Sequence, residues 1–128
     1  MKLLKIAFLL LAVNCFASSS DIYDELADAI RAGDAHHIAG YFDAKVNLAL
    51  SNQEDVYSKA QAELIVKDFL ARNAPKSFSI LHKGSSKEGT LYAIGNLVTL
   101  NGKTFRTSFF VKMSGGKYTI QELRFESQ

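Results

Sequence analysis

Residues 91–113 read LYAIGNLVTLNGKTFRTSFFVKM, and this stretch decides the fold. Two runs of apolar and β-branched residues flank Asn101-Gly102, a dipeptide typical of a two-residue hairpin turn. Such a turn pairs Leu100 with Lys103 and sets the register of all the pairs behind it. One face then carries Tyr92, Ile94, Asn96, Val98, Phe105, Thr107, Phe109 and Val111, and the other carries Leu91, Ala93, Leu97, Arg106 and Phe110. The first face is the more apolar, so we expect it to face the core.

The last strand needs one irregularity to fit this hairpin. Ile120 lies on the core face by alternation, and strict alternation would then turn Leu123 and Phe125 toward solvent. An extra residue at Gln121-Glu122, a β-bulge, returns both side chains to the core. The expected partners are Thr107 for Leu123 and Phe105 for Phe125. Because a bulge bends a strand, the pattern predicts a curved antiparallel sheet.

The N-terminal half has the pattern of helices. Apolar residues at helical spacing predict one helix over residues 21–32 and a short second helix that begins after Asp34. Alternation predicts a strand over residues 46–50, followed by a turn over residues 51–55. Ser58 and Gln61 form a capping box that opens a third helix, and Pro75 prevents that helix from continuing.

Residues 1–17 have the pattern of a secretory signal peptide. Two lysines precede an apolar run too short to span a bilayer, and Ala17 is a small residue suited to cleavage. The sequence therefore predicts an exported protein, periplasmic or extracellular, with a single domain over residues 18–128. The stretch around Cys15 also resembles a lipoprotein signal, so lipidation at Cys15 is the alternative that would attach the protein to a membrane.

The leader also accounts for the charge and for the cysteine content. The formal net charge of +2 equals the contribution of Lys2 and Lys5, so the remaining chain is balanced. A balanced chain without a dense basic run does not predict nucleic-acid binding. The one cysteine, Cys15, leaves with the leader, so we expect the domain to be held by its core rather than by a disulfide.

Two long stretches carry a resemblance to a known family. They are VYSKAQAELIVKDFLARNAPKSFSILHKGSSKEGTLYAIGNL, residues 56–97, and GGKYTIQELRFE, residues 115–126. They resemble the secreted bacterial family called domain of unknown function 4783, common in Bacteroidetes. The resemblance implies an α+β fold, the nuclear transport factor 2-like (cystatin-like) cone, in which N-terminal helices pack on a curved sheet. It implies no activity, so no catalytic residue is transferred; related cones include isomerases and dehydratases.

The motifs that suggest catalysis or metal binding do not have the required context. The glycines at 84 and 89 have phosphate-loop spacing, but Thr90 replaces the lysine and a strand follows instead of a helix. We expect Lys83 to Gly89 to be a solvated hairpin turn. His36 and His37 diverge by about 100° on a helix, so they cannot chelate one ion together. We therefore assign no metal site and no cofactor.

The candidate ligand site is the polar pair Asn96 and Thr107 in the otherwise apolar core face. One interpretation is a cross-strand hydrogen bond, and the other is the polar floor of a small cavity. The residues that would line this cavity are Tyr92, Asn96, Thr107, Phe109 and His82. His82 is either a half-buried histidine bonded to a neighbour or an acid-base group at the rim.

The opposite face of the hairpin is a candidate interface. Its apolar strip with a polar border consists of Leu91, Leu97, Arg106 and Phe110. Three functions remain open. The first is a non-catalytic binding module for an unknown small molecule or protein. The second is a small-molecule enzyme, isomerase-like or dehydratase-like, that uses Asp43 or His82 for proton transfer. The third is a weak structural homodimer.

Overall fold

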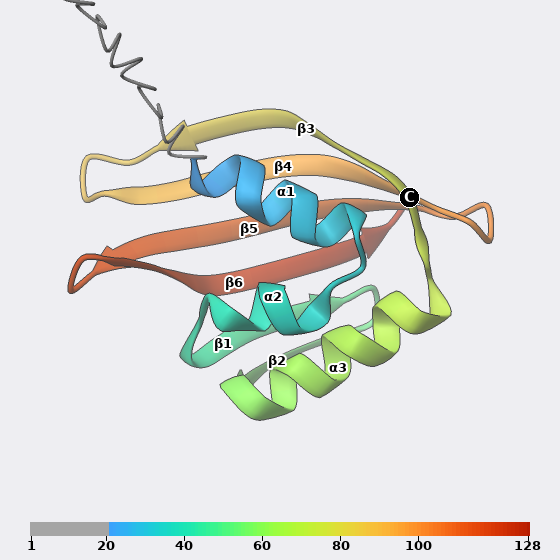
Figure 1. Ribbon diagram of the computed structural model, residues 1–128, viewed down its shortest axis with the longest axis horizontal. Coiled ribbons are helices and arrows are strands. Elements are labelled where there is room, and N and C mark those ends of the chain that lie inside the picture. The colour runs from blue at the N-terminus through green and yellow to red at the C-terminus, as the bar shows by residue number, and fades with distance from the viewer. Residues whose placement is uncertain (1–20) are drawn as a thin grey trace, which may run out of the picture.

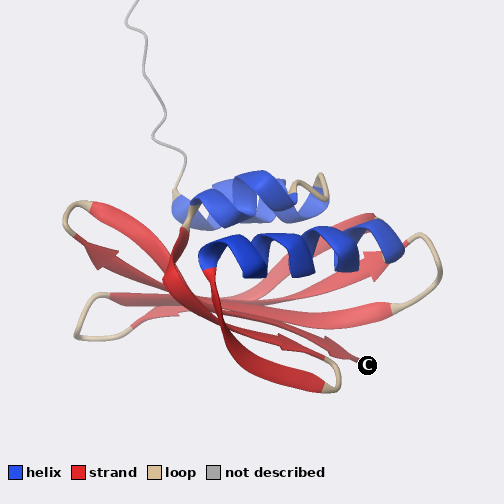
Figure 2. Ribbon diagram, turned by 90° about the horizontal axis from the view of Figure 1, so that it is seen from below, coloured by secondary structure: helices blue, strands red, loops and turns tan. Residues whose placement is uncertain are grey.

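A six-stranded sheet carries three helices on one of its faces in the computed structural model, which describes residues 21–128 (Figures 1 and 2). In chain order the elements are α1 (Ile22–Arg31), α2 (Ala35–Gly40), β1 (Phe42–Leu50), β2 (Gln53–Ser58), α3 (Lys59–Arg72), β3 (Pro75–Ser85), β4 (Thr90–Thr99), β5 (Thr104–Ser114) and β6 (Lys117–Ser127). Within residues 21–128, no helix has the length and apolar character needed to cross a membrane. The predicted leader and Cys15 lie outside the described residues.

The sheet is mixed rather than purely antiparallel. Its strand order is β2-β1-β6-β5-β4-β3, so the first long strand lies beside the last one (Figure 1). Strands β3 to β6 pair antiparallel, as the sequence predicted. Strand β1 pairs with β6 in parallel, with Leu48 opposite Leu123. Local pattern gives no signal for this parallel pairing, because the two strands are far apart in the chain.

Each helix begins at a side chain that caps its first turn. Asp21, Asp34 and Ser58 each accept a hydrogen bond from the backbone N–H three residues later, at distances of 2.8, 3.0 and 3.3 Å. Helix starts bind such oxygens because their first N–H groups have no partner within the helix. The three predicted helices are confirmed. The predicted turn over residues 51–55 is too long, since β2 already begins at Gln53.

The predicted register of the β4–β5 hairpin is wrong by one residue. The Thr99 N–H donates to Lys103 O (2.9 Å) and the Gly102 N–H donates to Thr99 O (3.1 Å), which makes a three-residue loop. Gly102 has a positive φ of 81°, as the last residue of such a loop requires. Leu97 therefore pairs with Phe105. A slip of one residue turns every side chain of β4 to the opposite face of the sheet.

The predicted bulge in β6 is confirmed. Val111 pairs with Ile120 and Phe110 pairs with Glu122, so Gln121 is the extra residue. Leu123 and Phe125 both return to the core, where each is fully buried. Their partners differ from the prediction by two residues along β5: Leu123 lies opposite Phe109 and Phe125 lies opposite Thr107. A second irregularity, at Leu81 in β3, adds to the bending of the sheet.

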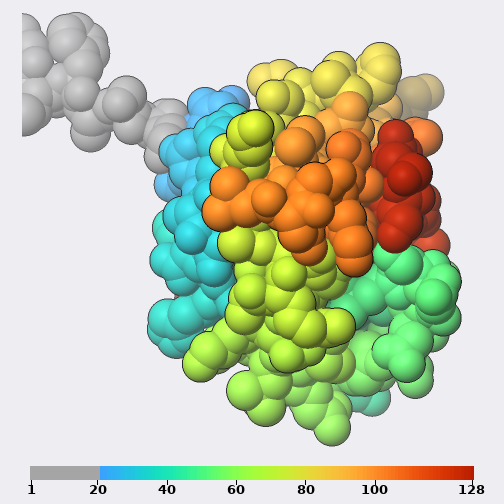
Figure 3. Space-filling view, turned by 90° about the vertical axis from the view of Figure 1, so that its right-hand side faces the viewer, coloured from blue at the N-terminus to red at the C-terminus, as the bar shows by residue number. Residues whose placement is uncertain are grey.

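The space between the sheet and the helices is filled by side chains. The Phe69 ring from α3 packs 4.6 Å from the Phe125 ring and 5.0 Å from the Phe105 ring. At one end, the β4–β5 hairpin lies against α3 and the C-terminal residues (Figure 3). The Asn101 amide donates to Asn73 Oδ1 (3.1 Å) and to Arg72 O (3.3 Å), which ties the hairpin to the end of α3. This end of the cone is therefore closed.

Candidate functional site

The structure separates the residues of the predicted cavity. Thr107 and Phe109 lie on the inner face and are buried, at 0% and 1% exposure. Tyr92 and Asn96 lie on the outer face, because the register of β4 is shifted, and His82 is exposed on the same face opposite Ile94. The Thr107 hydroxyl donates to Phe105 O (3.3 Å) rather than to Asn96. The predicted cavity around these residues does not form.

The predicted interface residues are separated for the same reason. Leu97 is fully buried, and Leu91 is half-buried against the core. Arg106 and Phe110 remain exposed on the outer face, as predicted. There they pair with Asn96 and Tyr92, the two residues that the sequence had placed inside the cone. On β4, the outer face thus carries Tyr92, Ile94, Asn96 and Val98 in place of Leu91, Ala93 and Leu97.

An exposed aromatic pair, Tyr92 and Phe110, is the main apolar feature of this outer face. The two rings lie 6.1 Å apart, and each residue keeps 37% of its surface exposed. Gly84, Tyr92, Phe110 and Glu122 are successive partners across β3, β4, β5 and β6. A Cβ at Gly84 would lie 2.7 Å from the Tyr92 ring, so the ring can occupy this position only because residue 84 has no side chain. A partner that buries these rings would gain favourable free energy of association.

The two acid-base candidates do not converge. Asp43 accepts a hydrogen bond from Gln121 Nε2 (3.0 Å), and this bond, followed by that from the Ala44 N–H, lowers the pKa of the carboxyl group. A lowered pKa is the wrong direction for a general base poised near neutral pH. His82 is on β3, four strands away from β1 in the sheet order, which corresponds to about 19 Å at the usual strand spacing. They cannot serve one substrate.

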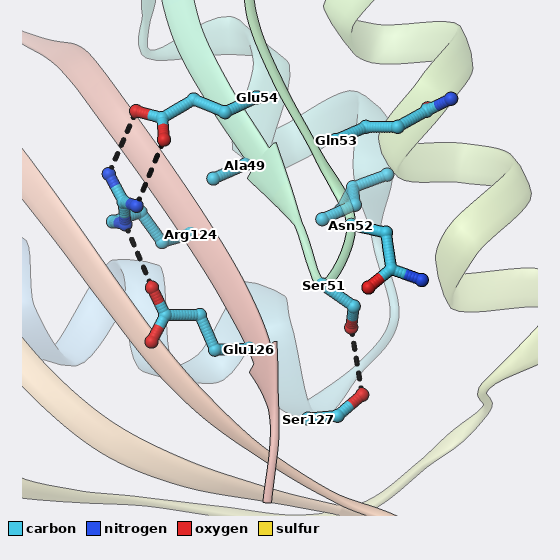
Figure 4. A pocket seen from close by; sticks show the side chains of 9 residues that line it. Ala49, Ser51, Asn52, Gln53, Glu54, Arg124, Glu126 and Ser127 are labelled. Atoms are coloured by element: carbon cyan, nitrogen blue, oxygen red, sulfur yellow. Dashed lines mark hydrogen bonds and ion pairs between the residues drawn. The ribbon is translucent and has the colours of Figure 1, made fainter.

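Four charged side chains, which the sequence pattern had not singled out, form a network on the outer face. Arg124 on β6 reaches across the small Ala49 of β1 and binds both carboxylate oxygens of Glu54 on β2, at 3.0 and 3.2 Å (Figure 4). It also contacts Glu122 and, at 3.2 Å, Glu126. The alternation of Glu122, Arg124 and Glu126 along one strand face was the signal in the sequence.

This network adds a side-chain contact between β2 and β6 to the backbone pairing of β2 with β1. Hydrogen bonds from Asn47 and then Arg124 lower the pKa of Glu54, and bonds to Glu122 and Glu54 raise the pKa of Arg124. Both shifts favour the charged forms of Glu54 and Arg124. The depression beside them encloses about 610 Å³, and its walls include Glu54, Arg124 and Glu126 together with small polar residues of the β1–β2 turn and the C-terminus (Figure 4). Its bidentate ion pair is satisfied internally, which fits a structural role.

The remaining predicted motifs are plain surface or core features. The turn between β3 and β4 covers only Ser86 to Gly89, so Lys83 belongs to β3, where its Nζ lies 5.2 Å from the Tyr23 ring. His36 contacts Glu63 at 3.2 Å, whereas His37 stacks on Tyr41. Among residues 21–128, no three side chains of the metal-binding types come together. All buried side-chain N and O atoms of this range have partners.

Comparison with known proteins identifies the family and the fold. The sequence profile of the domain of unknown function DUF4783 matches residues 23–126. A DUF4783 protein from Bacteroides fragilis is 29% identical, with a TM-score of 0.77 over 84% of this chain and 100% of that chain. One from Bacteroides ovatus is 27% identical, with a TM-score of 0.76 over 81% and 93%. A protein of unknown function from Shewanella baltica, described as NTF2-like, is 10% identical, with a TM-score of 0.63 over 83% and 87%.

The last of these likenesses concerns the fold alone. It confirms the predicted α+β cone of the nuclear transport factor 2-like type, with helices on a curved sheet. A comparison with curated proteins found no match.

Proposed function

This chain belongs to the DUF4783 family, and on that premise we propose that it is a binding module that recognises a second copy of itself through the outer face of its sheet. The observation that carries the proposal is the Tyr92–Phe110 pair, two neighbouring rings that are each 37% exposed. Paired exposed aromatics surrounded by polar groups are typical of the centre of protein interfaces.

The inner face supports binding less well than the outer face. The filled interior of the cone leaves the buried rings in contact with one another, and the buried polar atoms of residues 21–128 are satisfied. The outer face is not covered by the helices, which all lie on the other side (Figure 2). An uncovered sheet face with large apolar side chains at its centre gains free energy when it is buried by a partner.

The charges around the aromatic pair favour a second copy as that partner. The outer face of β6 carries Glu122, Arg124 and Glu126 and is acidic on balance, whereas that of β5 carries Arg106 and Lys112 and is basic. A two-fold axis between these strands lays β5 of one copy over β6 of the other. Opposite charges then meet twice, as a self-complementary interface requires.

The enzyme hypothesis has less support. It required at least two titratable groups that converge in a cavity, and Asp43 and His82 lie four strands apart. The exposed Tyr92–Phe110 pair, in contrast, fits a binding surface and does not require a catalytic role.

Sedimentation velocity over a wide concentration range tests the proposal. The wild-type protein should show a concentration-dependent dimer, and Phe110→Glu should raise the dissociation constant at least tenfold. Leu64→Glu is the matched control: Leu64 is 65% exposed on α3, outside the outer face, so this variant should dimerise normally. If wild type and Phe110→Glu both sediment as monomers throughout, self-association is wrong.

A further inference from the structure

A second candidate site lies outside the interface proposed above, at the end of the molecule that carries the β5–β6 turn. There α1, the end of α2 and the start of β6 surround a depression of about 420 Å³. We call it the mouth depression, and its lining residues are Ile22, Glu25, Gly40, Tyr41, Lys117 and Tyr118. Its volume is within the range of small-molecule sites. It is open to solvent, in contrast to the filled interior of the cone.

The acidic side of the mouth depression is held in place by a tyrosine. The Tyr41 hydroxyl donates a short hydrogen bond to Glu25 Oε2. Burial, followed by this bond, raises the pKa of Tyr41 to about 12, so the hydroxyl keeps its proton at neutral pH. The Tyr41 backbone is fixed as well, because Ile120 N–H donates to Tyr41 O. A carboxylate accepts several hydrogen bonds at once, so Glu25 can also receive an ammonium group.

The other walls supply a cation and an apolar surface. Lys117, at the start of β6, is exposed and brings a positive charge to the rim. Tyr118 keeps 37% of its surface exposed, and Ile22, a buried residue of the core, lines the same depression. A Cβ added at Gly40 would meet no atom within 4 Å, so the α2 side of the depression has open space.

We propose that the mouth depression binds a free α-amino acid with an apolar side chain. The ammonium group of the ligand pairs with Glu25, its carboxylate pairs with Lys117, and its side chain lies on Tyr118 and Ile22. A ligand with only one of these two charges can pair with only one of the two charged walls. Only a molecule with both charges next to an apolar body satisfies all three walls.

The test is a titration of the purified protein followed by the NMR shifts of its backbone amides. The probes are phenylalanine, phenylalaninamide, which lacks the carboxylate, and 3-phenylpropionate, which lacks the ammonium. Phenylalanine should bind with saturation, move the amides of Glu25, Tyr41 and Tyr118, and bind at least fivefold more tightly than either single-charge probe. If phenylalanine moves none of these amides, or if the three probes bind equally, the proposal is wrong.

Two variants and one control identify the contacts. Glu25→Gln keeps an acceptor for Tyr41 and should weaken phenylalanine and phenylalaninamide, but not 3-phenylpropionate. Lys117→Gln should weaken phenylalanine and 3-phenylpropionate, but not phenylalaninamide. Glu63→Gln removes a carboxylate that contacts His36 on the α2–α3 side and should change none of the three affinities. Equal weakening of all probes by both variants would mean a structural effect and would overturn the assignment.

Discussion

Deletion of Gln121 should be tolerated about as well as its replacement by alanine. Gln121 is the extra residue of β6, between Ile120 opposite Val111 and Glu122 opposite Phe110. Without it, only Glu122 separates Ile120 from Leu123, so strict alternation keeps Ile120, Leu123 and Phe125 on the inner face in their present pairs. If Gln121 were instead a regular member of the ladder, its deletion would turn at least one of these buried side chains toward solvent, which costs about 2–5 kcal/mol. We therefore expect the free energy of unfolding of the deletion variant to lie within about 1 kcal/mol of that of Gln121→Ala, since both lose the same side-chain hydrogen bonds.

The matched control is Gln121→Ala, which keeps the bulge. It removes the hydrogen bonds from Gln121 Nε2 to Asp43 (3.0 Å) and to Thr119 (2.9 Å). Each such bond contributes about 0.5–1.5 kcal/mol, and less where solvent competes. Urea denaturation followed by circular dichroism measures both variants. If the deletion is less stable than Gln121→Ala by about 2 kcal/mol or more, Gln121 is not the extra residue of β6, and the reasoning is refuted.

Three further predictions concern other parts of the molecule. Gly95→Ala should lower the free energy of unfolding by about 1–3 kcal/mol, because the new Cβ would lie 2.4 Å from the Ser79 carbonyl, whereas Gly40→Ala meets nothing within 4 Å and should be tolerated in the same urea experiment. The pKa of Tyr41 is raised from 10.0 to about 12, so the stability that it contributes is present below pH 10 and is lost as the pH rises toward 12; Tyr41→Phe should lack this loss in urea midpoints measured across that range. Intact-mass analysis of exported protein should give an N-terminus after Ala17, and a mass that includes lipid on Cys15 would show anchoring instead.

The β6 bulge was predictable because only one arrangement suits its residues. Leu123 and Phe125 alternate with Glu122 and Arg124, and Ile120 has the parity of the charged pair. A single inserted residue resolves the conflict, and no contact with a distant element is needed to see it. Their partners on β5 lie two residues away from those expected.

The β4 register, in contrast, was not predictable from the local pattern. Both faces of β4 are apolar, with Leu91, Ala93 and Leu97 on one side and Tyr92, Ile94 and Val98 on the other. Alternation therefore gives no preference, and the turn decides. Asn101 takes part in a three-residue loop, where its side chain binds Asn73 and the Arg72 carbonyl at the end of α3. These contacts span nearly thirty positions of the chain.

The position of the candidate interface follows from this one turn. Because Asn101 ties the hairpin to α3, Leu97 enters the core and Tyr92 turns outward to meet Phe110. The register that closes one end of the cone thus also creates the exposed aromatic pair of the proposed interface. Asn101→Ala should therefore disturb both the closed end of the cone and the outer aromatic pair. It removes the hydrogen bonds to α3 that favour the three-residue loop over a two-residue turn. A variant that kept the outer aromatic pair intact after losing this tie would show that packing of Leu97 alone determines the register.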